Sequence, residues 1–279
     1  MILDNKYELI EKLNEGSFGQ VYKSKHVRTG ELVAVKIERK SGTDKTCSSL
    51  KNEAKIYQYL SKEPNFIKLK WFGSNTDFVY LVTNLLVCSL TTLIKIKGSL
   101  PLKNILQLGI QMLKRIQTLH DKYLLHRDIK PDNFMLGSNK QLYLIDFGLC
   151  KRYDHAGQHI EEICKPNKSI VGTVNFVSLN VHKGIEPSRR DDVESCIYII
   201  LYLLQNGELP WLSEKDIKKI VYLKEQLTNE QPFIKEMMIN VRQLAFHSEP
   251  DYTFFLNILE GELLKFGSTL ERSGKGGKN

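Results

Sequence analysis

The sequence predicts an α+β fold of two lobes: a small five-stranded antiparallel sheet with one helix, followed by a larger, mainly helical lobe. Up to Thr83, apolar and polar residues alternate in short runs, which is typical of half-buried strands. After Leu86, apolar residues recur at helical spacing instead. A chain of 279 residues is also about as long as a domain grows before its core divides. We therefore expect an N-terminal lobe over residues 1–86, a C-terminal lobe over 87–266 and a flexible basic tail over 267–279.

Five strands and one helix account for the N-terminal lobe. Strand periodicity is clearest in the first three runs, and Arg28-Thr29-Gly30 supplies a hairpin turn between the second and the third. One longer segment has its apolar residues at roughly helical spacing. The predicted strands are Tyr7–Leu13, Gln20–His26, Leu32–Glu38, Ile67–Phe72 and Phe78–Thr83, and the predicted helix is Ser49–Leu60.

The C-terminal lobe is predicted to consist of helices. Leu102–Lys122 carries a broad apolar stripe and begins just after Pro101, a residue that suits the start of a helix. Val193–Leu204 is apolar on all sides, as expected of a helix in the middle of a lobe. The chain to about Phe266 also has helical character, whereas glycine, serine and lysine are frequent in the basic tail after it.

Composition indicates the cellular compartment of the protein and the class of its partners. The net charge of +8 favours anionic partners such as phosphates, acidic peptides, nucleic acid or lipid headgroups, without choosing among them. Five scattered cysteines with no C-x-x-C pair fit a reduced intracellular compartment, the cytoplasm or the nucleus or both. The most apolar stretch, Cys196–Leu204, is about half as long as a membrane span. We expect a monomer that neither spans a membrane nor requires nucleic acid.

A glycine-containing hairpin lies between the first two predicted strands. Residues 14–21 read N-E-G-S-F-G-Q-V, and such a hairpin can fold over nucleotide phosphates with its backbone amides exposed. Asn14 stands where the pattern G-x-G-x-x-G has its first glycine, and asparagine is the replacement that adopts positive φ most readily. Two glycines in a hairpin also fit an ordinary tight turn.

The third predicted strand carries a lysine next to a small residue. Strand alternation places Ala34 and Lys36 on one face, which leaves space for a base beside one and a phosphate beside the other. Glu53 on the following helix is a suitable partner that would hold the ammonium group against the phosphates. Glu15 and Glu38 are alternative partners for the same lysine.

The most specific motif in the sequence is H-R-D-I-K-P-D-N at residues 126–133. After a predicted strand over Leu142–Ile145, D-F-G follows at residues 146–148. Carboxylate and amide oxygens are hard ligands, so Asp146 and Asn133 suit the two metal ions that accompany nucleotide phosphates. Asp128 is then left to accept the proton of a substrate hydroxyl.

These motifs resemble the eukaryotic protein kinase superfamily over nearly the whole chain. The resemblance implies a bilobal kinase fold that binds ATP with Mg²⁺, with Asp128, Lys130 and Asn133 catalytic and with Asn133 and Asp146 as metal ligands. Lys130 is similar to the residue of serine/threonine kinases that steadies the γ-phosphate. The implied ATP-binding residues are Leu13, Gly16, Ser17, Phe18, Gly19, Val21, Ala34, Lys36, Glu53, Thr83, Asn84 and Leu86, with Thr83 as a small gatekeeper.

Finer features resemble the casein kinase 1 family, of which the chain would be a divergent member. They include N-K-Y at residues 5–7, W-F-G at 71–73 and G-I-E-P-S-R-R-D-D-V-E-S at 184–195. Ser178-Leu179-Asn180 stands where other kinases have A-P-E. This likeness implies a non-specific serine/threonine protein kinase that acts in signalling on protein substrates, with Asp192 anchoring the catalytic loop.

One departure from that family concerns an anion pocket that reads acidic or already phosphorylated residues before the target serine. The usual arginine of the pocket is Asn175 here, which leaves Arg127 and Lys168 as its basic members, with Arg152 and Lys165 nearby. We expect some preference for acidic or pre-phosphorylated contexts, but weaker selection than in the family. An ordinary solvated loop explains the same basic residues about equally well.

Three alternatives to an active protein kinase remain open at this point. A pseudokinase is favoured only by Asn14, since the residues needed for catalysis are all present. A nucleic-acid or membrane-surface module is suggested by the positive charge, yet no recognised binding motif accompanies it. A small-molecule phosphotransferase has a similar lobed plan, but the segment around Ser178-Leu179-Asn180 resembles a peptide-docking platform.

Overall fold

The computed structural model describes residues 1–16, 19–40, 49–155, 157–164, 169–227 and 231–273. The chain divides into two compact units. The first comprises Met1–Cys88 and Met135–Cys150, and the second comprises Ser89–Phe134 and Lys151–Asn279. The first unit is therefore discontinuous, which the sequence-based boundary after residue 86 did not anticipate.

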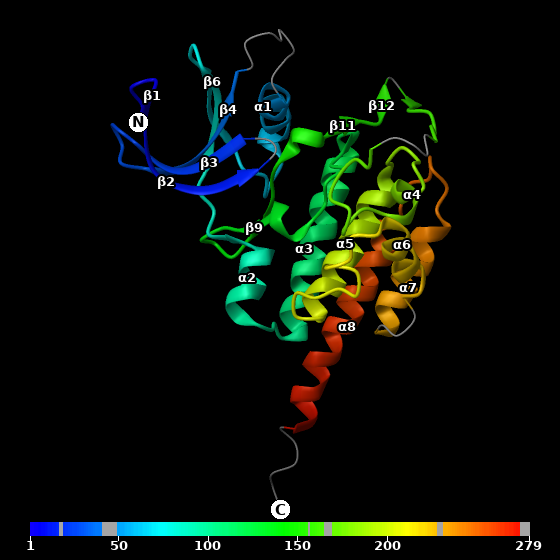
Figure 1. The fold of residues 1–279 in the computed structure, drawn as a ribbon. Coiled ribbons are helices and arrows are strands. Elements are labelled where there is room, and N and C mark those ends of the chain that lie inside the picture. Colours follow the sequence, from blue (N-terminus) through cyan, green and yellow to red (C-terminus); the bar gives the residue numbers. More distant parts are fainter. Residues whose placement is uncertain (17–18, 41–48, 156, 165–168, 228–230, 274–279) are drawn as a thin grey trace, which may run out of the picture. The chain divides into compact units, whose positions relative to one another are not determined.

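An antiparallel sheet of six strands forms most of the first unit (Figure 1). In spatial order the strands are β1 (Ile2–Leu3), β2 (Tyr7–Gly16), β3 (Gly19–His26), β4 (Leu32–Arg39), β6 (Phe78–Asn84) and β5 (Leu69–Ser74). The sequence predicted five strands, and the additional one is β1. It reverses into β2 through Asp4 and Asn5, which have φ values of 48° and 53°. A strand of two residues is too short for alternation to reveal.

Strand β4 shows how the sheet divides its two faces. Val33, Val35 and Ile37 are buried and belong to one hydrophobic cluster. Ala34 and Lys36 alternate with them and are only partly buried, so they lie on the opposite face. The shared face of Ala34 and Lys36 is as predicted.

Helix α1 (Ser49–Tyr59) is the helix of the first unit, and a 3₁₀ turn over Leu60–Lys62 follows it. The helix packs against β5, β6 and a second 3₁₀ turn, Phe147–Leu149. That turn follows the strands β9 (Phe134–Leu136) and β10 (Leu142–Leu144), which pair with each other. Residues 135–150 thus join the first unit through contacts that are distant in sequence.

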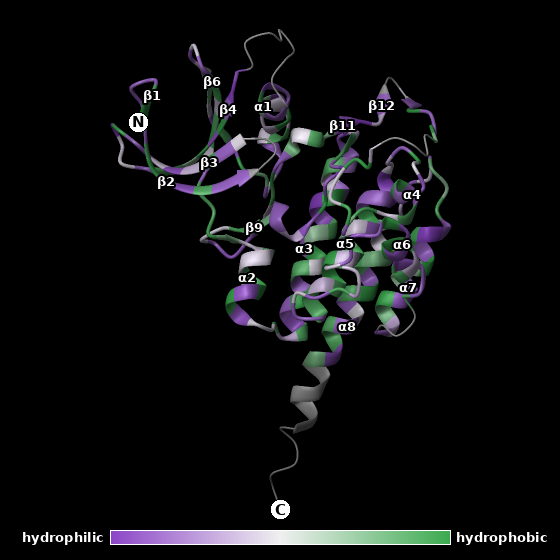
Figure 2. Ribbon diagram, in the orientation of Figure 1, coloured by the Kyte–Doolittle hydropathy of each residue, from purple (hydrophilic) through white to green (hydrophobic). Residues whose placement is uncertain are grey.

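Helices dominate the second unit. They are α2 (Leu90–Lys97), α3 (Leu102–Asp121), α4 (Leu179–His182), α5 (Arg189–Leu204), α6 (Ile217–Glu225), α7 (Pro232–Gln243) and α8 (Tyr252–Ser273). Helix α3 packs on α5 and α8, α7 packs on both α5 and α8, and α4 packs on α6. Figure 2 shows hydrophobic residues along α3 and along the part of α8 beside it. Nearly every residue of α5 is buried, as predicted for the central helix, and the α+β fold class is confirmed.

Outside the main sheet, β10 was predicted as Leu142–Ile145, and the other short strands were not predicted. These are β9 and also β7 (Cys88–Ser89), β8 (Leu124–Leu125), β11 (Lys151–Arg152), β12 (Asp154–His155) and β13 (Gln158–His159). Within the second unit β8 pairs with β11, and β12 pairs with β13. Strand β8 leads directly into the H-R-D motif, so its pairing fixes where that motif begins.

Helix α8 extends further than the sequence predicted. It runs to Ser273, so residues 267–273, which were predicted as the start of the tail, belong to the helix. A helix that is already formed continues through one glycine for about 1 kcal/mol, whereas starting a new helix there would be far less favourable. In the described part of the chain, no helix combines the length and the apolar character of a membrane span.

Candidate active site

The glycine-containing hairpin is formed by β2 and β3. Gly16 pairs with Gly19 across it, and two of the predicted ATP-binding residues, Ser17 and Phe18, lie outside the described residues. Asn14 lies in β2 directly after a register shift in the β2–β3 pairing, its φ is not positive, and its Oδ1 accepts a hydrogen bond from the Glu15 amide at 2.8 Å. Asn14 therefore does not use the positive φ that asparagine adopts more readily than other non-glycine residues.

Gly19, in contrast, cannot be replaced without moving the backbone. Its φ is +109°, and a Cβ atom added there would lie 2.2 Å from the carbonyl oxygen of Ile37. A side chain would thus separate β3 from β4 at the base of the hairpin.

Lys36, Glu53 and Asp146 form one ionic cluster in the first unit. The Lys36 Nζ atom lies 2.8 Å from Glu53 Oε2 and 2.7 Å from Asp146 Oδ1. The exposed fractions of these side chains are 13% for lysine, 3% for glutamate and 23% for aspartate. The predicted pairing of Lys36 with Glu53 is present, and the D-F-G aspartate shares the same ammonium group.

Burial and pairing act against each other in this cluster. Burial alone disfavours the charged amine, but Glu53 and Asp146 outweigh it and raise the pKa of Lys36. For Glu53, burial is the larger effect, and it raises the pKa to about 7 although Lys36 opposes the shift. Lys36 is therefore firmly protonated, and Glu53 depends on it to stay ionised.

The two alternative partners of Lys36 are occupied elsewhere. Glu15 accepts hydrogen bonds from Lys12 and Gln20 on the exposed hairpin. Glu38 accepts from the Ser49 hydroxyl at 3.1 Å and from the Leu50 amide at 3.2 Å, at the start of α1. These contacts stabilise the first turn of the helix that carries Glu53.

Packing on α1 holds the D-F-G motif. Phe147 is buried, and its ring makes an edge-to-face contact with Tyr57 at 4.9 Å and lies 6.3 Å from the ring of Phe66. The hydroxyl of Tyr57 accepts a hydrogen bond from the Asp146 amide at 3.3 Å. Asp146 has a φ of 64°, a conformation that costs about 1 kcal/mol or more and that these contacts hold in place.

Some of the remaining predicted ATP-binding residues share the face of the sheet that carries Lys36. Ala34 pairs with Thr83 in the β4–β6 register, and Val21 pairs with Lys36 across β3 and β4. Thr83 is buried, whereas Leu13 and Asn84 are exposed and Leu86 is half-buried. Contact of these residues with ATP stays a prediction.

In the second unit, Asp192 of α5 anchors the H-R-D motif through its backbone. Its carboxylate accepts hydrogen bonds from the His126 amide at 2.7 Å and from the Arg127 amide at 2.9 Å. The Nε2 atom of His120 lies 3.0 Å from the same carboxylate. Burial alone would raise the pKa of Asp192, but His120 and these donors lower it. Arg127 has a φ of 66°. The predicted anchoring role of Asp192 agrees with this geometry.

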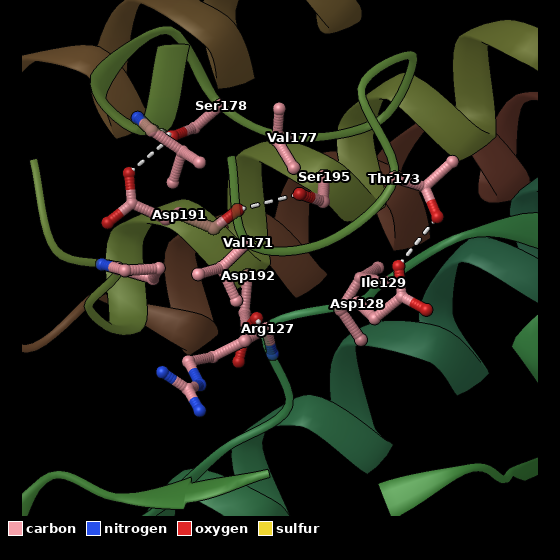
Figure 3. Close-up of a pocket in the computed structure, with 12 residues that line it drawn as sticks. Arg127, Asp128, Ile129, Val171, Thr173, Val177, Ser178, Asp191, Asp192 and Ser195 are labelled. Atoms are coloured by element: carbon pink, nitrogen blue, oxygen red, sulfur yellow. Dashed lines mark hydrogen bonds between the residues drawn. The ribbon is translucent and has the colours of Figure 1, made fainter. Parts of the chain in front are cut away.

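Asp128 is held by three side chains. Its Oδ2 accepts from Lys130 Nζ at 2.7 Å, and its Oδ1 accepts from the Thr173 hydroxyl at 2.7 Å. Figure 3 shows that hydroxyl directed at the carboxylate. Lys130 also lies 3.2 Å from Thr173 Oγ1, and Asn133 Nδ2 donates to the Asp128 backbone carbonyl at 2.9 Å. The carboxylate thus has a fixed orientation in which it can accept a proton.

The residues predicted to bind metal have suitable donor atoms. Asn133 uses its amide nitrogen on Asp128, which leaves the amide oxygen as its ligand atom. Asp146 provides a partly exposed carboxylate. Oxygen ligands of this kind suit a hard divalent ion. Their binding of a metal stays a prediction.

The predicted anion pocket is less well supported. Arg127 Nη1 lies 3.4 Å from Glu186, which also pairs with Lys151 at 2.8 Å. Asn175 Nδ2 donates to the carbonyl oxygen of Leu212 at 3.3 Å. Lys168 and Lys165 lie outside the described residues, and Arg152 donates to the Asp154 carbonyl at 2.7 Å. The structure therefore gives Arg127 and Asn175 separate partners.

Sequence reasoning missed the roles of Thr173, Tyr57 and His120. Thr173 contacts Asp128 across 45 positions, a distance over which spacing carries no information. Tyr57 lies one helical turn after Glu53 on the buried face of α1, and this periodicity could have indicated it. His120 is a polar residue on the buried face of α3, a similar signal.

A comparison with known families completes the assignment. The family model described as protein kinase domain matches residues 7–260, which include every candidate residue named above. Because this match covers most of the 279 residues, the chain belongs to the protein kinase domain family, whose members transfer phosphate from ATP with a divalent metal ion.

Proposed function

We propose that the chain is an active serine/threonine protein kinase of casein kinase 1 type. It transfers the γ-phosphate of ATP, bound with Mg²⁺, to serine and threonine hydroxyls of protein substrates. The observation that carries this proposal is the hydrogen-bond network of Asp128, Lys130 and Thr173. A carboxylate fixed by two donors can take the proton of a substrate hydroxyl, and an ammonium group beside it can stabilise the phosphate in transfer.

Two features support an active enzyme over a pseudokinase. The only residue that favoured a pseudokinase, Asn14, lies in β2 without a strained positive φ. The Lys36–Glu53 ion pair is also formed, and protein kinases require it for activity.

The casein kinase 1 type is supported by the segment that replaces A-P-E. The Ser178 hydroxyl caps α4 by accepting the Val181 amide at 3.1 Å and donates to Asp191 at 2.5 Å. Asn180 Nδ2 donates to the same carboxylate at 3.3 Å. The residues that resemble this family therefore make a consistent anchor on α5.

A direct test uses peptide pools with serine, threonine or tyrosine as the only hydroxyl acceptor, incubated with labelled ATP and MgCl₂. We expect label in the serine and threonine pools, background in the tyrosine pool, and no transfer after EDTA is added. Label confined to tyrosine would refute the serine/threonine assignment. Absence of label from every pool would refute the proposal of an active kinase.

Preference for pre-phosphorylated substrates is expected to be weak, because Glu186 already pairs with Arg127 and Lys151. Replacing this carboxylate with the neutral amide, Glu186→Gln, removes the competitor of a substrate phosphate. We expect kcat/KM for a peptide with phosphoserine upstream of its acceptor to rise about 3- to 10-fold relative to the unphosphorylated peptide, the size of one partly exposed charge-assisted hydrogen bond.

The matched control is Glu161→Gln, which removes the same charge from an exposed position. Steady-state kinetics would give, for each variant, the ratio of kcat/KM for the phosphoserine peptide to kcat/KM for the unphosphorylated peptide. A ratio that stays at the wild-type value in Glu186→Gln, or that rises equally in both variants, would show that Glu186 does not screen this pocket.

A further inference from the structure

Helix α6 buries a lysine. The Lys224 side chain is 0% exposed, and Lys224 is the only lysine among the buried residues of the described part of the chain. Taking an ammonium group out of water costs several kcal/mol unless its surroundings compensate. Burial lowers the pKa of Lys224 to about 7, with Glu194 opposing the shift and Arg242 adding to it. The contacts of the amine must therefore replace those of water.

The Lys224 amine binds the backbone and a neutral ring. Its Nζ donates to the carbonyl oxygens of Val177 at 2.7 Å and Val174 at 3.1 Å, and it lies 3.1 Å from His182 Nε2. Burial, with a contribution from Lys224, lowers the pKa of His182 to about 4. The ring is therefore neutral near pH 7, and Nε2 can accept. Three partners match the three N–H groups of an ammonium.

Glu194, the acidic group that acts on Lys224, binds other residues. Its Oε1 accepts from the Tyr198 hydroxyl at 2.7 Å and lies 3.4 Å from Arg242 Nε. The Lys224 amine instead lies over the rings of Tyr198 and Trp211, at 4.8 Å and 5.5 Å from their centroids. Carbonyl dipoles and aromatic faces thus take the place of an ion pair.

The two carbonyl groups belong to residues 173–178, which we call the docking segment. At its start, Thr173 donates to Asp128. At its end, Ser178 caps α4. Lys224 binds the backbone between these two points, and Figure 3 shows Thr173, Val177 and Ser178 along the same segment. The lysine therefore adds two hydrogen bonds to the middle of the segment, where Trp211 Nε1 also donates to the Asn175 carbonyl oxygen at 2.8 Å.

We propose that Lys224 is a positioning residue for protein substrates. Its amine binds the middle carbonyl groups of the docking segment. These hydrogen bonds maintain the contact of the Thr173 hydroxyl with Asp128, and they maintain the conformation of the segment that receives the substrate chain. This inference rests on the proposed function as a serine/threonine kinase. The Lys36 cluster belongs to the first unit, whereas Lys224 and the docking segment belong to the second. Loss of the amine is therefore expected to lower kcat/KM for the protein substrate and to leave KM for ATP unchanged.

Three variants test this role. Lys224→Met removes every donor while keeping an unbranched apolar chain, and Lys224→Gln retains two N–H donors on a shorter chain. Lys218→Met is the matched control, because Lys218 is exposed on the same helix. Should Lys224→Met not fold, the comparison is made between Lys224→Gln and Lys218→Met.

For Lys224→Met we expect kcat/KM for a serine peptide to fall about 10- to 100-fold, as for a small misplacement of catalytic groups. KM for ATP stays within about twofold of wild type, since no contact of the Lys36 cluster changes. Lys224→Gln recovers part of the loss, and Lys218→Met behaves as wild type. A peptide kcat/KM in Lys224→Met equal to that of Lys218→Met would overturn the proposal. So would a parallel change in KM for ATP, which indicates general destabilisation.

Hydrogen exchange gives a readout that does not depend on catalysis. The amides of Phe176 and Val177 donate to the Thr173 carbonyl at 2.8 Å and 3.1 Å. We expect both to exchange faster in Lys224→Met than in wild type and Lys218→Met. Unchanged protection would refute the positioning role. Faster exchange together with a wild-type protein that labels no serine or threonine peptide would instead refute the proposed function and leave the role of Lys224 in holding the segment intact.

Discussion

Asp128→Asn is expected to lower kcat for peptide phosphorylation by about 10²- to 10⁴-fold, the usual contribution of a general base. Asparagine keeps the shape of the side chain, and its amide oxygen can still accept from Lys130 or Thr173. It cannot accept the proton of a substrate hydroxyl. Because the loss lies in the chemical step, KM for ATP should stay within about threefold of wild type. Steady-state kinetics with a serine peptide, at saturating ATP, would measure both values.

Asp132→Asn is the control for this experiment. Asp132 lies in the same loop, but its side chain is exposed and none of the described hydrogen bonds involves it. The control is expected to retain the wild-type kcat within about twofold, as is usual for exposed positions. A kcat for Asp128→Asn equal to that of the control would remove Asp128 from the mechanism.

The fold could be predicted wherever periodicity extends over several residues. The strands of the first unit and helices such as α3 lie within a few residues of their predicted positions. The prediction was incomplete where a few residues pair or where distant segments meet. The two-residue strand β1 is one case, and the addition of residues 135–150 to the first unit is another. Neither leaves a periodic pattern, because tertiary contacts alone determine both.

The candidate site also combines contacts that local spacing predicts with contacts that only the tertiary structure determines. The pair of Lys36 and Glu53 could be predicted, because a strand face and a helix face each follow from local spacing. The contact of Thr173 with Asp128 could not, since it depends on how a long loop folds back. Lys224 left a partial signal, because it lies four residues after Ile220 on the buried face of α6. That spacing indicates burial of a lysine without indicating which carbonyl groups it binds.

Lys36→Met is the second substitution with a large expected effect. It should reduce kcat/KM for phosphoryl transfer by about 10²- to 10³-fold, as loss of one preorganised electrostatic contact does in other enzymes. Methionine fills a similar volume, but it cannot bind phosphate oxygens. Lys51→Met is the control, because Lys51 is an exposed residue of α1, close to Glu53 in sequence. Transfer rates within about threefold of the control would show that Lys36 does not act on the nucleotide.

The same substitution is expected to destabilise the folded state, because it leaves Glu53 buried without its counter-charge. Removing one partner of a buried ion pair costs about 3–5 kcal/mol. The pKa of Glu53 is already raised to about 7 with Lys36 present, and it should rise further without it. The folded state then holds a proton that the unfolded state releases near pH 4.5. The stability that this proton provides is therefore fully present below about pH 4.5 and is lost as the pH rises to the folded-state pKa, by at most about 1.4 kcal/mol per pH unit.

Urea unfolding of Lys36→Met and wild type from pH 5 to pH 8 would test this sign. The gap between the two free energies of unfolding should stay nearly constant below about pH 7, where Glu53 is protonated in both proteins, and should widen above it. The double variant Lys36→Met/Glu53→Gln removes the titrating buried carboxyl of this cluster, and Asp146 is 23% exposed, so water can compensate its charge. The double variant should therefore be more stable than Lys36→Met at pH 8 and should lose the added pH dependence. A gap that stays constant with pH would mean that Glu53 does not depend on Lys36 for its charge.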